Sequence, residues 1–476
     1  MVQRLFLPLL LLVLLCVPRV LAQALPELGD VSAAAITPAD ERRLGESIMR
    51  EIRRDPSYLD DPEVADYVNS LGSRLTVRSD AVRQEFEFFV IQDPQINAFA
   101  LPGGFIGINT GLLLAAQSES EVAGVLGHEV AHVTQRHIAR MIGQQGQNQL
   151  LSIAALAVAI LAARSNSQVG EAAVAFGQAG IVQSQLNFTR DNEREADRIG
   201  LQLLESAGLD PRGMAVFFER LQRATRIYEG GAPSYLRTHP LTFERIADIQ
   251  NRIEGMPYRQ VPDSLDFQLI RAKLRAETGS PRDAVAFFEA SFAERKFLSE
   301  TASRYGLVAS LIRARDFARA RTEIVPLRKT ANPIIENLAC QLVDAAEDAT
   351  NALKCYQDAR RAYPGYRALF YGHVEQLLRA RQPAVVLQMI DNRMQTQPSD
   401  ARLYRLQARA YAAQGNSLQQ HRAQGEAYFR NGQLGLAVEQ MQIALKAGGG
   451  DFYQLSAIEA RLREFRRLLL EQERKR

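Results

Sequence analysis

The hydrophobic pattern in the N-terminal part of the chain changes from a helical to a strand period. Residues 36–52 (ITPADERRLGESIMREI) and 61–75 (DPEVADYVNSLGSRL) have the spacing and the capping residues of helices. Residues 86–93 (FEFFVIQD) and 104–113 (GFIGINTGLL) are instead rich in β-branched and aromatic residues, and a stretch with Gly and Pro separates them. The pattern predicts two helices followed by two strands of a small sheet.

Two apolar stretches lie further along the chain, after a segment rich in histidine. Residues 150–163 (LLSIAALAVAILAA) contain a single Ser, and residues 171–182 (EAAVAFGQAGIV) follow after a polar break. The first stretch is shorter than the roughly 20 apolar residues that a helix needs to span a bilayer. We expect a helical hairpin here, either buried against its domain or in contact with a membrane or an apolar client.

From about residue 265 onward, the chain has helical spacing and almost no strand signal. Residues 304–318 (RYGLVASLIRARDFA) align with residues 370–384 (FYGHVEQLLRARQPA) at an offset of 66, about two units of 34. This pattern resembles the tetratricopeptide repeat family, with about four imperfect units over residues 265–450. Such repeats stack into a solenoid whose concave surface suits protein partners, whereas the alternative is a plain helical bundle.

The composition is that of a globular protein with room for two or three domains. Of the 476 residues, 46% are hydrophobic and 23% are charged, and the formal net charge is +3. Because this balance creates no strong basic field, we expect no nucleic acid among the partners of the protein.

The N-terminus is typical of a cleavable secretory signal. Arg4 precedes an apolar run from Leu5 to Cys16, and small residues near Ala22 have the spacing of a cleavage site. The apolar run is too short for a membrane anchor that stays uncleaved. We therefore expect residues 1–22 to be removed during export of the chain.

Cys340 and Cys355 are the two cysteines that remain after removal of the signal, in a compartment that permits disulfides. They flank a sequence with a predicted turn at its centre, so they occupy nearly mirror-image positions of a helical hairpin. We expect a disulfide between them, and two free buried thiols are the alternative that the sequence leaves open.

The segment VLGHEVAHVTQRH contains three of the six histidines in the chain. His128 and His132 are four residues apart, so on a helix both imidazoles project from one face and can bind one ion. Glu129 is rotated by one residue, and its carboxylate can take a proton from a water molecule beside that ion. The pattern His-Glu-x-x-His therefore predicts a hydrolytic metal site, with core histidines that bind other partners as the alternative.

Glu193 is the residue that we expect to complete the metal site. In the segment RDNEREADRIG, Glu193 and Asp197 share one face of a predicted helix, while Glu195 points away. Two histidines and a glutamate with an open fourth position form a known ligand set for zinc, and Asp197 can accept the N–H of one histidine. His137, about 140° around the helix from His132, is expected on the surface or behind the ligands. A solvated acidic helix face is the alternative for this segment.

These motifs resemble the zinc metallopeptidase family that includes the CAAX prenyl proteases and HtpX. The similar segments are HEVAH, EREAD about 65 residues later, the preceding NAFALPGGFIGINTGLL and the following THPLTFERI. The resemblance implies that His128, His132 and Glu193 bind one zinc ion per chain and that Glu129 is the catalytic acid and base. Because the chain lacks the spanning helices of the integral-membrane members, it is most similar to the soluble, periplasmic branch.

The resemblance to the periplasmic branch also implies a function and a set of partners. It implies a zinc-dependent endopeptidase for quality control and assembly of outer-membrane β-barrel proteins, which degrades misfolded clients. The expected partners are misfolded or unassembled outer-membrane proteins and, through the repeat domain, the β-barrel assembly machinery, with peripheral membrane contact. The alternative is a chaperone or assembly adaptor with latent or minor proteolysis, and a third hypothesis, a lipid-facing enzyme, rests on the apolar hairpin alone.

The same resemblance places His239, in the segment RTHPLTFERI, at the rim of the active site. An imidazole there can stabilise the oxyanion of the tetrahedral intermediate, or it can ligate the metal and make the resting enzyme latent. A structural histidine that caps the next helix is a further alternative. Arg245 on that helix is expected to orient this segment or the acidic cluster.

The strand before the histidine helix is the expected binding site for substrate. Asn97, Ala98, Phe99 and Ala100, together with the following FIGINTGLL segment, supply an edge to which an extended peptide can add by main-chain hydrogen bonds. Because main-chain pairing depends little on side chains, we expect cleavage to favour unfolded chains with exposed strands.

Together, these features predict an α+β fold that is mainly α. We expect a gluzincin-type metallopeptidase domain with a small β-sheet over residues 33–262. An α-solenoid of tetratricopeptide repeats is expected to follow over residues 265–476.

Overall fold

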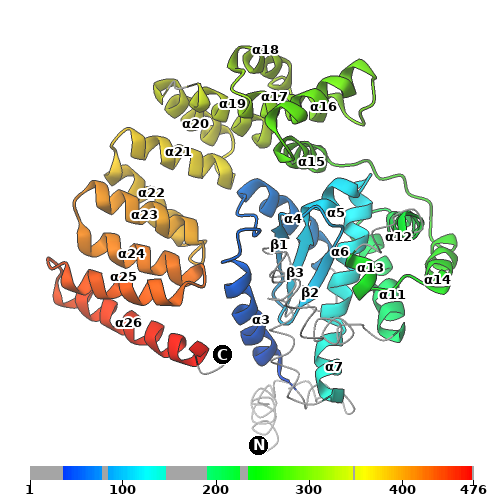
Figure 1. Ribbon diagram of the computed structural model, residues 1–476, viewed down its shortest axis with the longest axis horizontal. Helices are drawn as coiled ribbons and strands as arrows, with labels where there is room; N and C mark the ends of the chain where they lie inside the picture. Colours follow the sequence, from blue (N-terminus) through cyan, green and yellow to red (C-terminus); the bar gives the residue numbers. More distant parts are fainter. Residues whose placement is uncertain (1–35, 78–83, 146–189, 226–233, 347–348, 474–476) are drawn as a thin grey trace, which may run out of the picture.

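The computed structural model describes five parts of the chain, residues 36–77, 84–145, 190–225, 234–346 and 349–473. Within them the chain is mainly helical with one small sheet, which confirms the predicted class (Figure 1). The predicted signal, residues 1–22, and the predicted apolar hairpin, residues 150–163 and 171–182, lie outside the described residues. Each helix in the described ranges is too short or too polar to cross a bilayer.

Two capped helices begin the described chain, as the sequence predicts. Helix α3 (Pro38–Ile52) follows Thr37, whose side chain accepts a hydrogen bond from the backbone N–H of Asp40. Helix α4 (Pro62–Thr76) follows Asp61, whose carboxylate caps its first turn in the same way. Both helices start with a proline, which has a suitable φ and needs no hydrogen-bond acceptor at that position.

The sheet has three strands in the described residues, whereas the sequence predicted two. β1 (Glu87–Ile91) pairs in parallel with β3 (Phe105–Asn109), and β2 (Ala98–Leu101) pairs antiparallel with β3, so the order is β1-β3-β2. The second predicted strand also ends early, because helix α5 (Thr110–Ala115) begins directly after it. With four residues between a loop and a Gly/Pro turn, β2 is too short for its period to be recognised.

Helix α6 (Glu119–Thr134) is the central element of this half of the chain. It is buried from Glu119 to Val133 and contacts α4, β2, α11 and α12. Each large apolar side chain that such a helix buries contributes roughly 1.5–3 kcal/mol to folding. The other helices of this half are α7 (His137–Gln145), α11 (Arg190–Ser206), α12 (Arg212–Thr225), α13 (Ser234–Thr238) and α14 (Phe243–Glu254).

The second half of the described chain is a row of helices in which each helix contacts the next (Figure 1). A disulfide joins Cys340 to Cys355 across two neighbours in this row, with their Cα atoms 5.5 Å apart. The helices are α15 (Leu265–Glu277), α16 (Pro281–Ala293), α17 (Glu300–Arg313), α18 (Phe317–Leu327), α19 (Pro333–Ala345), α20 (Ala349–Ala362), α21 (Arg367–Arg379), α22 (Pro383–Met394), α23 (Ala401–Ala413), α24 (Ser417–Arg430), α25 (Leu434–Lys446) and α26 (Phe452–Glu473).

The internal repeat in the sequence corresponds to a repeated packing contact. Gly306 on α17 lies against the ring of Phe288, and Gly372 on α21 lies against the ring of Tyr356. A Cβ atom on these glycines would come within 2.1 and 2.2 Å of the respective rings, which is too close for any side chain. The two glycines are 66 residues apart, the offset that relates the two sequence segments, and the two rings are 68 residues apart. A glycine packed against an aromatic ring of the preceding helix therefore recurs in both segments.

The row of helices forms an arc whose inner side faces α3 and α4 (Figure 1). Asp60, just before α4, forms ion pairs with Arg402 and Arg405 on α23. On α4 itself, Oε2 of Glu63 lies 2.7 Å from Nζ of Lys273 on α15. Part of the surface that the sequence analysis expected to be open to partners is thus covered by the N-terminal half of the same chain.

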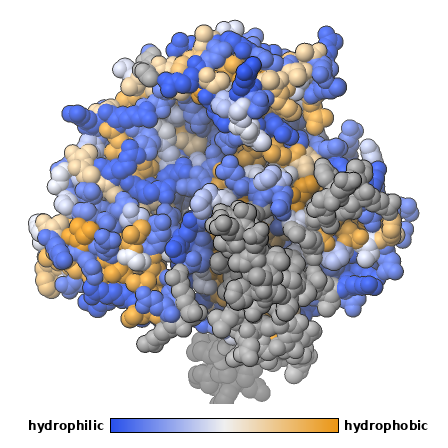
Figure 2. Space-filling view, viewed as in Figure 1, coloured by the Kyte–Doolittle hydropathy of each residue, from blue (hydrophilic) through white to orange (hydrophobic). Residues whose placement is uncertain are grey.

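The described surface on the side shown in Figure 2 is mainly hydrophilic. Hydrophobic residues are scattered over it, among others on the helices of the arc. Single exposed apolar side chains of this kind are normal on a protein surface.

Candidate metal centre

Close packing of α6 against α11 brings the predicted ligands together. Gly127 on α6 and Gly200 on α11 face each other, and a Cβ atom on Gly127 would lie 3.2 Å from the carbonyl oxygen of Gly200. Because neither residue has a side chain, the two helix backbones can approach closely. Glu193, two turns before Gly200, therefore reaches the face of α6 that carries His128 and His132.

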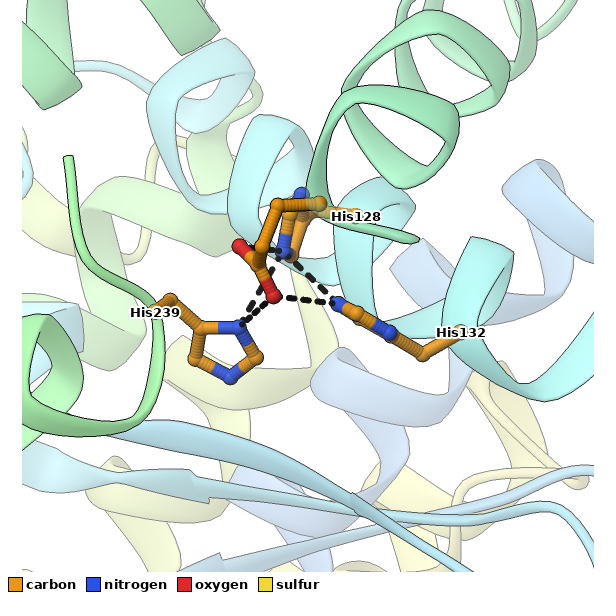
Figure 3. A group of neighbouring side chains, drawn as sticks. His128, His132 and His239 are labelled. Carbon is orange, nitrogen blue, oxygen red and sulfur yellow. Dashed lines mark hydrogen bonds and ion pairs between the residues drawn. The ribbon is translucent and has the colours of Figure 1, made fainter. Parts of the chain in front are cut away.

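Three imidazoles and one carboxylate converge at one point (Figure 3). The Nε2 atom of His128 lies 3.0 Å from Nε2 of His132 and 3.3 Å from Nδ1 of His239. Oε1 of Glu193 lies 3.0 Å from Nδ1 of His239 and 3.4 Å from Nε2 of His132. Ligands at about 2.0–2.1 Å from a tetrahedral ion are about 3.4 Å apart, so these four residues have the spacing of a metal site.

The protonation states in this buried cluster also suit a metal ion. Burial lowers the pKa of His132 well below its usual value, so this imidazole is neutral and its lone pair is available. Although burial opposes ionisation of Glu193, its contacts with His239, His128 and His132 hold the pKa of this carboxyl well below its usual value. Neutral imidazole and ionised carboxylate are the forms that bind metals.

Asp197 and Arg245 contact residues of the cluster: Asp197 contacts His128, and Arg245 contacts Glu193. Oδ1 of Asp197 lies 2.9 Å from Nδ1 of His128, and Arg245 donates to both oxygens of Asp197 and to the carbonyl oxygen of Pro240. Burial opposes a charged imidazole, but hydrogen bonds to Asp197 and Glu193 raise the pKa of His128 to about 9. The two carboxylates therefore favour a positive charge at this point, which a metal ion can supply. Arg245 contacts both the acidic cluster and the His239 segment.

His137 contacts the predicted ligand His132, because the chain changes direction between them in a way that the sequence did not reveal. Helix α6 ends at Thr134 and Arg136 has a positive φ of 53°, so His137 starts a new helix and the assumption of one continuous helix was wrong. Its Nδ1 lies 2.8 Å from Nδ1 of His132, and its Nε2 lies 3.1 Å from Oε2 of Glu195. Glu195, which we expected to point away from Glu193, forms this contact with His137.

Glu129 lies beside the cluster. Its Oε1 is 3.6 Å from Nε2 of His239, and within the described residues neither of its carboxylate oxygens has a hydrogen bond. Burial raises the pKa of Glu129 above its usual value, although His239 and His128 act against this rise. A carboxyl whose pKa is moved toward neutrality is suited to accept and release a proton during catalysis.

The edge of β2 lies next to this site, where the sequence analysis expected substrate to bind, and the structure corrects one part of that expectation. The N–H of Asn109 on β3 donates to the carbonyl oxygen of Asn97 at 2.9 Å. By the alternation of an antiparallel ladder, Ala98 and Ala100 then turn their main-chain groups to the opposite edge, which no described strand pairs with. Phe99 turns its main-chain groups toward β3. The FIGINTGLL segment is not part of this edge, because β3 is the central strand.

A His-Glu-x-x-His helix whose histidines meet a glutamate from a second helix is the arrangement of a metallopeptidase. Over residues 62–253 the chain matches peptidase family M48. It is also 31% identical over 453 residues to the "Beta-barrel assembly-enhancing protease" of Escherichia coli O157:H7, an alignment that covers 94% of this chain and 92% of the relative. The chain therefore belongs to peptidase family M48, and the metallopeptidase activity expected from the sequence is confirmed.

Two further relatives differ in how much of the chain they match. The "Putative beta-barrel assembly-enhancing protease" of Vibrio cholerae serotype O1 is 38% identical over 307 residues, which cover 64% of this chain and 63% of the relative. "Mitochondrial metalloendopeptidase OMA1" of Schizosaccharomyces pombe is 32% identical over 227 residues, 46% of this chain and 62% of the relative. The similarity to the Escherichia coli relative thus extends through the arc of helices as well as the catalytic half.

Proposed function

We propose that this protein is a zinc-dependent endopeptidase of the periplasm that acts on misfolded or unassembled outer-membrane β-barrel proteins. The observation that carries this proposal is the buried ligand set of His128, His132 and Glu193 beside Glu129. Similarity over 94% of the chain to a relative named for β-barrel assembly supports the class of substrate. Removal of residues 1–22 as an export signal is part of the same proposal.

In the proposed mechanism, His128, His132 and Glu193 hold the zinc ion, since two imidazoles and a carboxylate suit this metal. The chemistry that bound zinc supplies is polarisation of the scissile carbonyl and a lower pKa of a water molecule. Glu129 takes a proton from the attacking water and passes it to the nitrogen of the leaving amine. Asp197 accepts the Nδ1–H of His128 and so fixes the tautomer that leaves Nε2 free for the metal.

His239 favours a latent resting state in this proposal. Its Nδ1 lies 3.0–3.3 Å from the nearest atoms of Glu193 and His128, the spacing of a fourth ligand. A zinc site with four protein ligands has no open position for water or substrate. His239 must therefore move away before the enzyme can act.

Substrate would bind as an additional strand on the outer edge of β2. The main-chain groups of Ala98 and Ala100 face this edge, and the amide of Ala100 lies close enough to the Glu129 carboxylate to affect its pKa. An extended peptide on this edge would run past the general base. Unfolded β-barrel proteins contain many segments that can add in this way.

We further propose that the arc from α15 to α26 is a tetratricopeptide solenoid that contacts the β-barrel assembly machinery. Between α4 and the arc, a polar cleft of about 520 Å³ remains open, lined among others by Asp60, Lys273, Tyr371 and Arg409. Since the N-terminal half covers other parts of the inner side, this cleft is the inner surface that we assign to a partner. Peripheral contact with the outer membrane remains part of the proposal.

The second candidate function is a chaperone or assembly adaptor, which the position of His239 at the metal site favours. The variant Glu129→Gln separates the two functions, because it removes the general base and leaves the ligands in place. We expect it to abolish cleavage of a denatured outer-membrane β-barrel protein by the zinc-loaded chain. Full support of outer-membrane protein assembly by Glu129→Gln in cells lacking the wild-type protein would instead favour the adaptor.

A further inference from the structure

Tyr235 is a buried residue of the site that the sequence analysis did not single out. Its side chain is fully buried on α13, and its hydroxyl has no hydrogen-bond partner among the described residues. The ring stacks on the imidazole of His239, with centroids 4.8 Å apart and an angle of 28° between the planes. The centroid of the Tyr235 ring also lies 6.4 Å from the centroid of the His128 ring. The phenol is therefore part of the metal centre.

An unpartnered hydroxyl in this position calls for an explanation. A buried polar group without a hydrogen bond costs folding free energy, because the group leaves water and gains nothing in exchange. A phenylalanine in place of Tyr235 would keep the stacking on His239 and the contact with Phe218, whose ring centroid lies 6.1 Å away. It would do so without the cost of the unpartnered hydroxyl. A hydroxyl kept in such a place is expected to meet its partner in another state of the protein, for example when substrate is bound.

The hydroxyl of Tyr235 can act as a hydrogen-bond donor. A phenol is protonated at neutral pH. Because the ring of Tyr235 packs against the imidazoles of His239 and His128, the phenol belongs to the metal centre. From there it can donate a hydrogen bond to an oxygen that becomes negative during the reaction.

The backbone of Tyr235 ties this donor to the substrate edge. Its N–H donates to the carbonyl oxygen of Ile96 at 3.2 Å, and the hydroxyl of Ser234 donates to the same oxygen. Ile96 lies two residues before β2, so α13 is held at the start of the strand to which the peptide would add. The N–H of His239 donates to the carbonyl oxygen of Tyr235 at 2.9 Å, which links the phenol to the residue that must move.

We propose that Tyr235 is a catalytic residue whose hydroxyl donates a hydrogen bond to the oxyanion of the tetrahedral intermediate. The inference rests on the proposed peptidase function. When the water oxygen bonds to the scissile carbon, the electron pair of the carbonyl moves to its oxygen, and Glu129 receives the proton of the water. Tyr235 keeps its own proton and stabilises that oxygen by its hydrogen bond. When the C–N bond breaks, the pair returns to the carbonyl and Glu129 protonates the amine.

The test is the variant Tyr235→Phe in the zinc-loaded full chain, with Tyr453→Phe, an exposed tyrosine on α26, as the matched control. We expect kcat for a peptide substrate to fall by about 10²-fold with little change in KM, as on removal of one oxyanion donor. Zinc content should be unchanged and the melting temperature equal or higher, because the unpartnered hydroxyl is gone. A kcat within about twofold of wild type, or a loss of kcat together with a loss of zinc, would overturn the inference.

A second measurement keeps this inference separate from the proposed function. A phosphonate peptide that mimics the tetrahedral intermediate should bind Tyr235→Phe at least about tenfold more weakly than wild type, while an uncleaved peptide of the same sequence binds both equally. Equal binding of the phosphonate would overturn the role of Tyr235 even if turnover is slow. Undiminished cleavage by Glu129→Gln would refute the proposed mechanism instead, whatever the phosphonate shows.

Discussion

Nδ1 of His239 lies 3.3 Å from Nε2 of His128, which is the spacing expected of two ligands of one metal ion. The sequence left two roles open for His239 in the site, oxyanion donor or blocking ligand. The distance favours the second role, since an oxyanion donor would have to leave room for the substrate oxygen between itself and the ion. The hydroxyl of Tyr235 is then available for the first role.

Removing the imidazole of His239 should release the enzyme. In His239→Ala the ion keeps three ligands and gains an open position, so we expect the initial rate of casein cleavage to rise several-fold at equal zinc content. Casein cleavage and zinc content of purified wild type and variant measure this directly. A variant that binds zinc but loses cleavage would show that the imidazole takes part in the chemistry.

The chain of contacts from His132 through His137 to Glu195 should tune metal affinity. Because Glu195 accepts from His137, which in turn contacts His132, Glu195→Gln should weaken zinc binding about tenfold. Competition with a chelator of known affinity gives the dissociation constant. The control is Glu205→Gln, an exposed residue of the same helix. Equal affinities for both variants would mean that this chain of contacts has no effect on the ion.

The buried pair of Glu63 and Lys273 should hold the two halves of the chain together. Oε2 of Glu63 lies 2.7 Å from Nζ of Lys273, and Asn337 and Tyr366 also donate to Glu63. Glu63→Ala leaves a buried ammonium with Asp61 alone and should cost about 3 kcal/mol in urea unfolding. The double variant Glu63→Ala, Lys273→Met should be more stable than this single variant. Strictly additive losses would contradict coupling between the two residues.

The disulfide between Cys340 and Cys355 should stabilise the arc mainly by restricting the unfolded chain. The cysteines are 15 positions apart, and closing a loop of this length is worth about 3 kcal/mol. The variant Cys340→Ser, Cys355→Ser should therefore unfold at lower urea concentration than the oxidised wild type. Reduced wild type serves as the control and should match the variant. An unchanged midpoint would mean that the bridge adds nothing to stability.

Local signals explain what the sequence could predict. Thr37 and Asp61 cap their helices from neighbouring positions, and the four-residue spacing of His128 and His132 fixes one face of α6 before any tertiary contact forms. These features depend on residues only a few positions apart. Glu193 is different, because only the face that it shares with Asp197 is a local feature. Its selection as a ligand also rested on the resemblance to the metallopeptidase family, which pairs this segment with the histidine motif.

The rest depends on tertiary structure. The reversal at Arg136, which turns His137 back toward His132, has no strong local signal, because a positive φ is rare for arginine. The contact of Asp60 with Arg402 joins positions far apart in the sequence, so the partial covering of the inner side of the arc could not be foreseen. Tyr235 was missed because a lone tyrosine before a His-Pro segment carries no spacing that indicates a role.

The measurement that tests the central claim most directly is zinc content together with casein cleavage for wild type, His132→Ala and Glu129→Gln. The proposed site predicts about one zinc per chain in wild type and Glu129→Gln, a large loss of zinc in His132→Ala, and cleavage by wild type alone. Wild-type protein that binds no zinc, or a Glu129→Gln variant that cleaves as fast as wild type, would contradict the site and its mechanism.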